Sequence, residues 1–350
     1  MGNYNYRDKK VYIGIDVHKK TYACASVCDG YIVKKDTMPA EPSALISYIK
    51  NNFSEGEIET AYEASFSGFN LHRQLTCAGI KNIIVNPSSI EIASRDKVKN
   101  DKRDAKKIAT QLAAGRLKSI YIPTLKQEAK RTTTRLRNSI LKLKCQIGLK
   151  IKALLFTQGL IKAEDDKVIS KKWLNQKLNE VEQLNYPTGF FYTIKRYSDQ
   201  WNNFTNDLQT IKKELLTMQS EEEQKLLSIY KSALGIGDII ALTLKDELGD
   251  MSHFTNEKKL FNYLGFTPTE HSSGDNIRYS HISRQGRAIL RYILLEASWV
   301  AIRKDPSLEK IYQRIKTSRG AKIAIVGVAR RLAGRLRSCL KNGKFYEIKS

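Results

Sequence analysis

The chain has 350 residues, enough to bury a hydrophobic core and to form two or three domains. Hydrophobic residues make up 41% and charged residues 27%, which excludes an intrinsically disordered chain. Sixty Lys and Arg against 36 Asp and Glu leave a formal net charge of +24. Because so large an excess repels itself, nucleic acid is the first partner to consider; diffuse surface charge or attraction to a membrane surface is the alternative.

The cysteines and the apolar runs give no sign of a zinc site or a membrane span. The five cysteines are scattered, without the CxxC or Cys/His spacing of a zinc site. The N-terminal MGNYNYRDKK has no apolar signal-peptide core, and the run YILLEASWVAI is interrupted by Glu296 and too short to cross a bilayer. We therefore expect a protein of a reducing compartment, cytoplasmic and nucleoid-associated, with no membrane partner.

Residues 1–123 alternate strand and helix signals. The apolar, β-branched runs VYIGIDVH, TYACASV and YIVKKDTM predict an antiparallel meander, with Asp29 and Gly30 in a tight turn. A helix over 44–49 follows, and then come a strand IETAYEAS, a helix FNLHRQLTCAGI, a strand KNIIVNP and a helix DAKKIATQLAAGR. Three antiparallel strands and then α, β, α, β, α is the order of a ribonuclease H-like α/β fold, although other α/β folds share parts of it.

Residues 124–230 change to helix with few breakers. Apolar residues recur at steps of three or four and predict one stripe along a long helix: Leu136, Ile140, Leu143, Ile147, Ile151 and Leu154. Basic residues between them are candidates for nucleic-acid contacts: Lys142, Lys144, Lys150 and Lys152. A coiled-coil arm near nucleic acid, with 197–230 as its returning helix, fits this pattern, and a hairpin with ordinary solvated lysines fits it equally.

Residues 231–350 are again mostly helical but richer in glycine. Gly235 and Gly237 form a Gly-Ile-Gly turn before a helix, as in helix-hairpin-helix modules, where backbone N–H groups approach a phosphate. A polar loop over 265–281 and helices around 290–303 and 321–340 follow. The expected fold class is therefore α/β followed by an all-α part.

Four acidic residues stand out by their positions. Asp16 ends the first apolar strand, and Glu63 ends a later strand beside the small residues of EASFSG. Asp101 and Asp104, three apart, share one face of a helix start. Hard divalent cations prefer carboxylate oxygens, and two such ions about 4 Å apart can stabilise the attacking and leaving oxygens of a phosphodiester. Taken singly, each residue is better explained as a turn, surface or capping residue.

A family resemblance joins these four residues. The strings YIGIDVHKK, AYEAS, VNPSS and KNDKRDAKKIA resemble the N-terminal half of the insertion-sequence DEDD transposases of the IS110 type, whose first domain is similar to the RuvC resolvases. The family's acidic tetrad maps to Asp16, Glu63, Asp101 and Asp104, and Asn100 stands where Thr is usual. The resemblance implies a RuvC-like fold and Mg²⁺ as cofactor, as two ions for which Mn²⁺ can substitute.

The resemblance continues near the C-terminus. ALGIGDIIA has Leu234 in place of the family's usual Pro, and FNYLGFTPTEHSSGDNIRYSHISRQGRAILRYILLEA is similar to the family's transposase domain. The serine that attacks DNA in that family falls on Ser273, next to Ser272, and Gly274 makes the backbone there permissive. Three arginines that could clamp a phosphate follow: Arg284, Arg287 and Arg291.

The serine assignment depends on the resemblance, because without it both serines would be polar turn residues. His271 and His281 are near in sequence as candidate bases, although groups of the acidic domain could activate the hydroxyl instead. Ser283 is a weaker competitor, and we expect it to cap the helix that follows.

The combined prediction is a transposase or site-specific DNA recombinase that cuts and rejoins DNA through a serine link. Expected domains are a RuvC-like catalytic domain (1–123), a coiled-coil arm (124–230) and a transposase domain (231–350). The resemblance implies double-stranded donor and target DNA, a bridge RNA encoded by the element as guide, and a homodimer that pairs into a tetramer. The alternatives are a Mg²⁺-dependent structure-specific nuclease that uses water and a non-catalytic basic nucleic-acid-binding protein.

Overall fold

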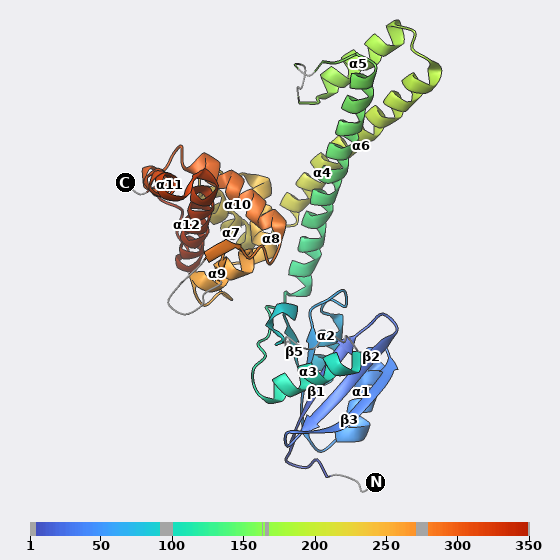
Figure 1. The fold of residues 1–350 in the computed structure, drawn as a ribbon, viewed down its shortest axis with the longest axis vertical. Helices are drawn as coiled ribbons and strands as arrows, with labels where there is room; N and C mark the ends of the chain where they lie inside the picture. The colour runs from blue at the N-terminus through green and yellow to red at the C-terminus, as the bar shows by residue number, and fades with distance from the viewer. Residues whose placement is uncertain (1–4, 92–100, 163, 165–167, 271–278, 349–350) are drawn as a thin grey trace. The chain divides into compact units, whose positions relative to one another are not determined.

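A computed structural model describes residues 5–91, 101–162, 164, 168–270 and 279–348. The chain divides into two compact units, Met1–Ile122 and Pro123–Ser350 (Figure 1). Ser272, Ser273 and His271 lie outside the described residues, and Asp101 is described by its backbone alone.

The first unit is built on a five-stranded sheet. β1 (Lys10–Val17), β2 (Thr21–Cys28) and β3 (Tyr31–Pro39) form an antiparallel meander. β4 (Glu57–Glu63) and β5 (Lys81–Val85) run parallel to β1 on its other side, which gives the order β3-β2-β1-β4-β5. Asp29 and Gly30 both take positive φ, 51° and 81°, in the turn between β2 and β3. The predicted meander and its Asp-Gly turn are confirmed.

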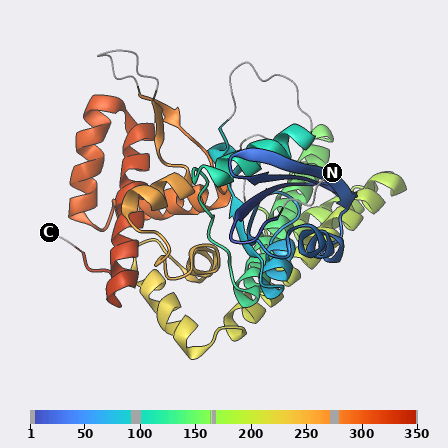
Figure 2. The ribbon, with the colours of Figure 1, turned by 90° about the horizontal axis from the view of Figure 1, so that it is seen from below.

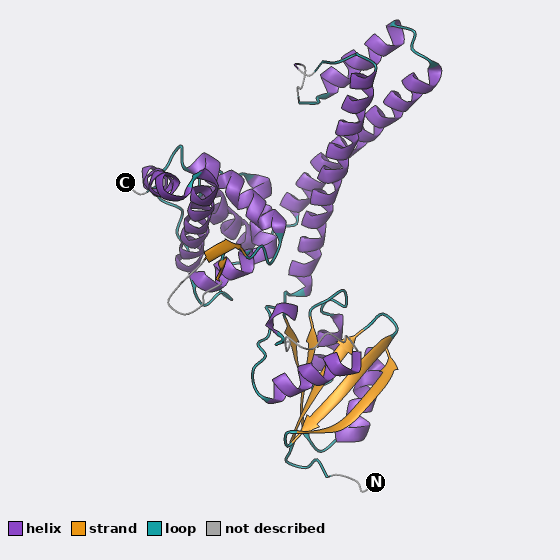
Figure 3. Cartoon of the chain, in the orientation of Figure 1, coloured by secondary structure: helices purple, strands orange, loops and turns teal. Residues whose placement is uncertain are grey.

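Helices cover both faces of this sheet (Figure 3). α1 (Pro42–Phe53) and α2 (Asn70–Cys77) pack on the face that carries Ile13, Ile15 and Tyr62. α3 (Asp101–Ala113) packs on the opposite face. A 3₁₀ turn, η1 (Pro87–Ser89), follows β5. Three layers around a mixed sheet are consistent with a ribonuclease H-like fold.

The second unit begins with a pair of long helices. α4 (Leu125–Thr157) and α6 (Thr188–Thr217) lie side by side and run in opposite directions, and α5 (Lys171–Gln183) packs against α6 (Figure 1). Their shared core includes Ile151, Leu155 and Trp201. The expected returning helix over 197–230 is in fact two helices, since the chain breaks before α7 (Glu221–Ser232), where Ser220 and Glu223 form a capping box.

The predicted apolar stripe of α4 is only partly buried. Ile151 is buried, but Leu136 and Leu143 are 51% and 46% exposed. The reason is that the first half of α4 turns its polar residues inward: Arg131 and Thr134 are buried, and both donate hydrogen bonds to α8 (Asp238–Leu248). Coiled-coil pairing of this stripe therefore stays a prediction.

The remaining helices pack around one large hydrophobic core and a second, smaller one that includes Leu308 and Tyr312, and the helices nearest the C-terminus gather together (Figure 2). After α8 come α9 (Glu257–Leu264), α10 (Ala288–Ala301), α11 (Pro306–Arg319) and α12 (Ala321–Asn342). No helix in the described ranges is long and apolar enough to cross a membrane.

Two local features of this part bear on the predictions. The Gly-Ile-Gly turn precedes α8 as predicted, and a Cβ on Gly235 (φ +80°) would lie 2.5 Å from the carbonyl oxygen of Ala297. That glycine thus permits close packing against α10. The polar loop predicted over 265–281 instead contains two strands, β6 (Pro268–Glu270) and β7 (Tyr279–Ile282), which pair as an antiparallel hairpin.

Candidate active site

Asp16 and Glu63 lie at the same end of two adjacent parallel strands. In the register of β1 and β4, Gly14 pairs with Ala61 and Ile15 with Tyr62, so Asp16 and Glu63 are the next two residues. Ile15 and Tyr62 are buried among the α1 and α2 side chains. Because side chains alternate along a strand, Asp16 and Glu63 point to the opposite face, which carries α3.

Gly14 allows α3 to lie directly on β1. A Cβ at Gly14 would stand 2.2 Å from the carbonyl oxygen of Ala105. Near its C-terminal end, α3 lines a pocket through Thr110 together with Tyr12, which lies at the start of β1. The helix therefore runs opposite to β1, and its first turn, with Asp104, lies toward the end of the strand that carries Asp16.

The described carboxylates already have polar neighbours. Oδ2 of Asp16 is 3.1 Å from Nε2 of His18, and Oδ1 of Asp104 is 3.2 Å from Nζ of Lys107. His18 was not among the predicted site residues, although it follows Asp16 by only two positions in the sequence. Among the side chains that the structure describes, no three Asp, Glu, His or Cys gather closely enough to hold a metal ion.

The four predicted lysines of the arm differ in their surroundings. Lys142 and Lys150 are exposed, although Nζ of Lys150 lies 5.7 Å from the ring centre of Tyr197. Nζ of Lys144 lies 4.1 Å from the ring centre of Trp201, and burial lowers its pKa. Lys152 is half-buried. Lys142 and Lys150 thus present the most accessible charges of this set.

The three predicted arginines also differ. Arg284 is exposed and adopts a left-handed backbone conformation (φ 53°). Arg291 donates from Nη1 to the carbonyl oxygens of Leu264 and Gln285, at 3.1 and 2.8 Å, and so holds the backbone around the hairpin. Nε of Arg287 lies 3.4 Å from Oε2 of Glu247. Arg291 therefore fastens this loop to α9.

Ser283 does not cap the helix that follows it. The N-cap residue of α10 is Arg287, and no side chain caps that helix. The backbone N–H of Ser283 instead donates to the carbonyl oxygen of Thr267 at the base of the hairpin. The predicted cap was wrong because four residues separate Ser283 from the first turn of α10.

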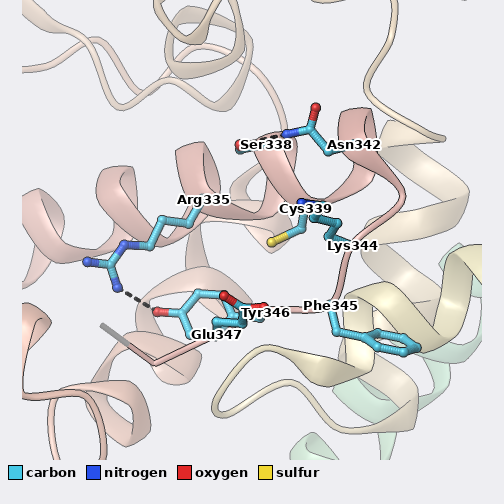
Figure 4. A pocket seen from close by; sticks show the side chains of 8 residues that line it. All are labelled: Arg335, Ser338, Cys339, Asn342, Lys344, Phe345, Tyr346 and Glu347. Carbon is cyan, nitrogen blue, oxygen red and sulfur yellow. Dashed lines mark hydrogen bonds between the residues drawn. The ribbon is translucent and has the colours of Figure 1, made fainter. Parts of the chain in front are cut away.

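A pocket of about 250 Å³ lies between α12 and the C-terminal segment (Figure 4). Among its lining residues, Arg335 donates to the Tyr346 hydroxyl at 2.8 Å and pairs with Asp305 at 2.7 Å. None of the predicted site residues lines this pocket.

Two protein-family models match the chain. A DEDD transposase model of the IS110 type matches residues 13–157, and a model described as the transposase IS116/IS110/IS902 family matches residues 227–313. The first match spans the positions of Asp16, Glu63, Asp101 and Asp104, and the second spans that of Ser273.

Named transposases are similar over much of their length. A protein of Sinorhizobium fredii named as the transposase y4qE is 25% identical over 342 residues, which cover 96% of this chain and 83% of that protein. The transposase for insertion sequence element IS1533 of Leptospira borgpetersenii is 27% identical over 262 residues, 71% of this chain and 72% of that protein. The transposase for IS1111A of Coxiella burnetii is 22% identical over 237 residues, 66% of this chain and 62% of that protein.

These matches agree with the arrangement of the first unit. A DEDD transposase domain implies dependence on a divalent metal ion and action on DNA. The prediction of an enzyme is therefore confirmed against the alternative of a non-catalytic binding protein. The chain belongs to the IS110-type DEDD transposases, enzymes that cut and rejoin DNA.

Proposed function

We propose that this transposase cuts DNA with the hydroxyl of Ser273 while Asp16, Glu63, Asp101 and Asp104 hold Mg²⁺. The observations that support the proposal are the register of β1 and β4 and the packing of α3 on β1. Asp16 and Glu63 are the next residues after the pair Ile15 and Tyr62 on the adjacent strands β1 and β4. Gly14 lets α3 lie directly on β1, with its first turn toward the end of the strand that carries Asp16.

The donor set suits a hard divalent cation. Its members are carboxylates, which Mg²⁺ prefers, and they come from two strands and one helix. Two Mg²⁺ ions, or Mn²⁺ in their place, would when bound stabilise negative charge on the attacking and leaving oxygens. His18 would orient the carboxylate of Asp16 through their 3.1 Å contact.

In the proposed cleavage, the Ser273 oxygen attacks a backbone phosphorus of DNA. A bond forms between the serine oxygen and the phosphorus, which stays attached to the 5′ oxygen of one DNA end. The bond from the phosphorus to the 3′ oxygen of the other end breaks, and the serine proton ends on that 3′ oxygen. The number of phosphodiester-type bonds is unchanged, so rejoining needs no nucleotide cofactor. Arg284 and Lys142 would contact the phosphate backbone.

The remaining parts of the proposal concern partners and domain roles. We assign residues 1–123 to metal-dependent catalysis, 124–230 to a coiled-coil arm and 231–350 to the serine-bearing domain. Donor and target DNA would be selected by a bridge RNA from the element, within a dimer that pairs into a tetramer at the nucleoid. The net charge of +24 supports a protein that holds several polyanions together.

A suicide DNA substrate with a nick near the cleavage position tests the serine. We expect a covalent protein–DNA adduct with Mg²⁺, which is absent with Ser273→Ala and retained with the matched control Ser272→Ala. Cleavage by Ser273→Ala without any adduct would instead favour the nuclease that uses water.

The same substrate tests the acids. Asp16→Asn and Asp104→Asn should each lower cleavage at least 100-fold at unchanged melting temperature, because a positioned metal ion contributes several kcal/mol to transition-state stabilisation. Asp199→Asn, at an exposed position of α6, is the matched control. Equal cleavage by the wild type and both acid variants would remove these carboxylates from the site.

A further inference from the structure

One buried carboxylate in the second unit is surrounded by three arginines. The side chain of Glu247, near the end of α8, is 2% exposed. Arg135 donates two hydrogen bonds to the Glu247 carboxylate, from Nε at 2.8 Å and from Nη2 at 2.9 Å. Nε of Arg287 lies 3.4 Å from the same carboxylate, and Nε of Arg131 lies 3.9 Å from it.

Arg131 belongs to the interior of this cluster. Its side chain is 7% exposed, and it donates to the carbonyl oxygens of Asp246 and Glu247 at 2.9 and 2.6 Å. Its hydrogen bonds are therefore directed at the C-terminal turn of α8, where carbonyl oxygens lack helical partners. Arg131 therefore connects α4 to α8 inside the cluster, whereas Arg135 and Arg287 lie at its surface.

Arg135 and Arg287 stand at the surface. Their side chains are 37% and 44% exposed, although Glu247 between them is buried. Arg135 directs Nε and Nη2 at Glu247, which leaves its Nη1 outside this pair, and the nitrogen of Arg287 nearest to Glu247 is Nε. In the described part of the chain, Glu247 is the one acidic residue paired with either of them.

The charges of this cluster do not balance. At the surface of the cluster, the two guanidinium groups of Arg135 and Arg287 share the single carboxylate of Glu247, so positive charge exceeds negative charge there. Burial lowers the pKa of Arg287, and the nearby Arg135 and Arg131 act in the same direction, while Glu247 opposes them. A further anion would relieve this repulsion, and a fork of guanidinium groups matches the oxygens of a phosphate.

We propose that Arg135 and Arg287, held in place by Glu247, form a binding site for a backbone phosphate of nucleic acid. The position of Ser273 falls between β6 and β7, the two strands of the hairpin. Arg287 lies five residues after the end of β7. The site would therefore anchor a strand at the base of the serine loop, and in this respect it rests on the proposed function. The arm would contribute to binding through Arg135 of α4.

The test measures binding without chemistry. Full-length protein carrying Ser273→Ala is titrated in EDTA with a DNA duplex and, in a parallel arm, with a structured RNA, over a series of salt concentrations. Each phosphate contact contributes about 0.9 to the slope of log K against log salt for duplex DNA. We expect Arg135→Gln and Arg287→Gln each to weaken binding several-fold and to reduce the slope by about one contact, in the arm whose phosphate occupies the site.

A matched variant and a stability measurement control the result. Arg196→Gln removes an arginine of α6 whose side chain is 61% exposed, and we expect it to leave the slope unchanged. Arg287→Gln should fold normally because its side chain is the most exposed of the cluster, which melting curves check. Unchanged slopes in both arms with folded Arg287→Gln and Arg135→Gln would overturn the site. Because neither metal nor the serine takes part, this outcome is independent of the cleavage experiments.

Discussion

The backbones of Gly14 and Ala105 lie in direct contact, so that a Cβ on Gly14 would stand 2.2 Å from the carbonyl oxygen of Ala105. Gly14 is an ordinary strand residue in its backbone angles, and the glycine is required for space. This contact ties the strand that carries Asp16 to the helix that carries Asp104. In the proposed metal site, the distance between this strand and this helix would control whether Asp16 and Asp104 can bind the same ion.

Replacing Gly14 with Ala should therefore separate α3 from β1. The neighbouring atoms are backbone and cannot move aside, so we expect a loss of about 1–3 kcal/mol in unfolding free energy, as for other overpacked sites. Cleavage should fall together with Mg²⁺ affinity. Melting curves and the Mg²⁺ dependence of cleavage measure both effects. Gly189→Ala, where no atom lies within 4 Å of the added Cβ, is the control.

His18 should act by orienting Asp16. Removing the partner of a metal-binding carboxylate costs about 10–100-fold in metal affinity or activity. We expect His18→Ala to raise the Mg²⁺ concentration for half-maximal cleavage by such a factor at little cost in melting temperature. His18→Gln, which keeps a polar group, should recover part of the loss. An unchanged Mg²⁺ requirement in His18→Ala would contradict the role.

Glu223 makes the second unit sensitive to acid. Burial acts to raise the pKa of this carboxyl, but hydrogen bonds from Lys130 and Ser220 and the charge of Lys245 outweigh it and lower the pKa to about 2. The stability that this group contributes is therefore complete above its unfolded pKa of about 4.3 and is lost as the pH falls toward 2. Between these values the melting temperature of Glu223→Gln should fall less steeply than that of the wild type. Glu221→Gln, an exposed residue of the same helical turn, should follow the wild-type slope.

Asp305 should be the most sensitive acid of the C-terminal helices. It is 1% exposed, caps α11 through the N–H groups of Ser307 and Leu308, and pairs with Arg335. Asp305→Asn leaves the guanidinium with a neutral partner, and we expect a loss of about 3 kcal/mol, as when other buried ion pairs are broken. Denaturant unfolding measures it. The exposed pair of Asp199 and Arg196 serves as control, since surface pairs contribute about 0–1 kcal/mol.

The sequence by itself determined the order of strands and helices in the first unit. The apolar runs around Ile13 and Tyr62 predicted strands, and Asp29 with Gly30 predicted the tight turn, because these signals act between near neighbours along the chain. The family resemblance identified the four acidic residues as candidate metal ligands. His18 was missed because a histidine after a strand has no distinctive local pattern.

Only the tertiary structure decided which residues meet. The parallel pairing of β1 and β4 makes Asp16 and Glu63 neighbours, and the fold brings Arg135 to Glu247 across 112 residues of sequence. It also exposed Leu136 of the predicted stripe, because α8 accepts hydrogen bonds from the opposite side of α4. Helical periodicity says which residues share a face but not what that face packs against, and that depends on contacts between segments far apart in the chain.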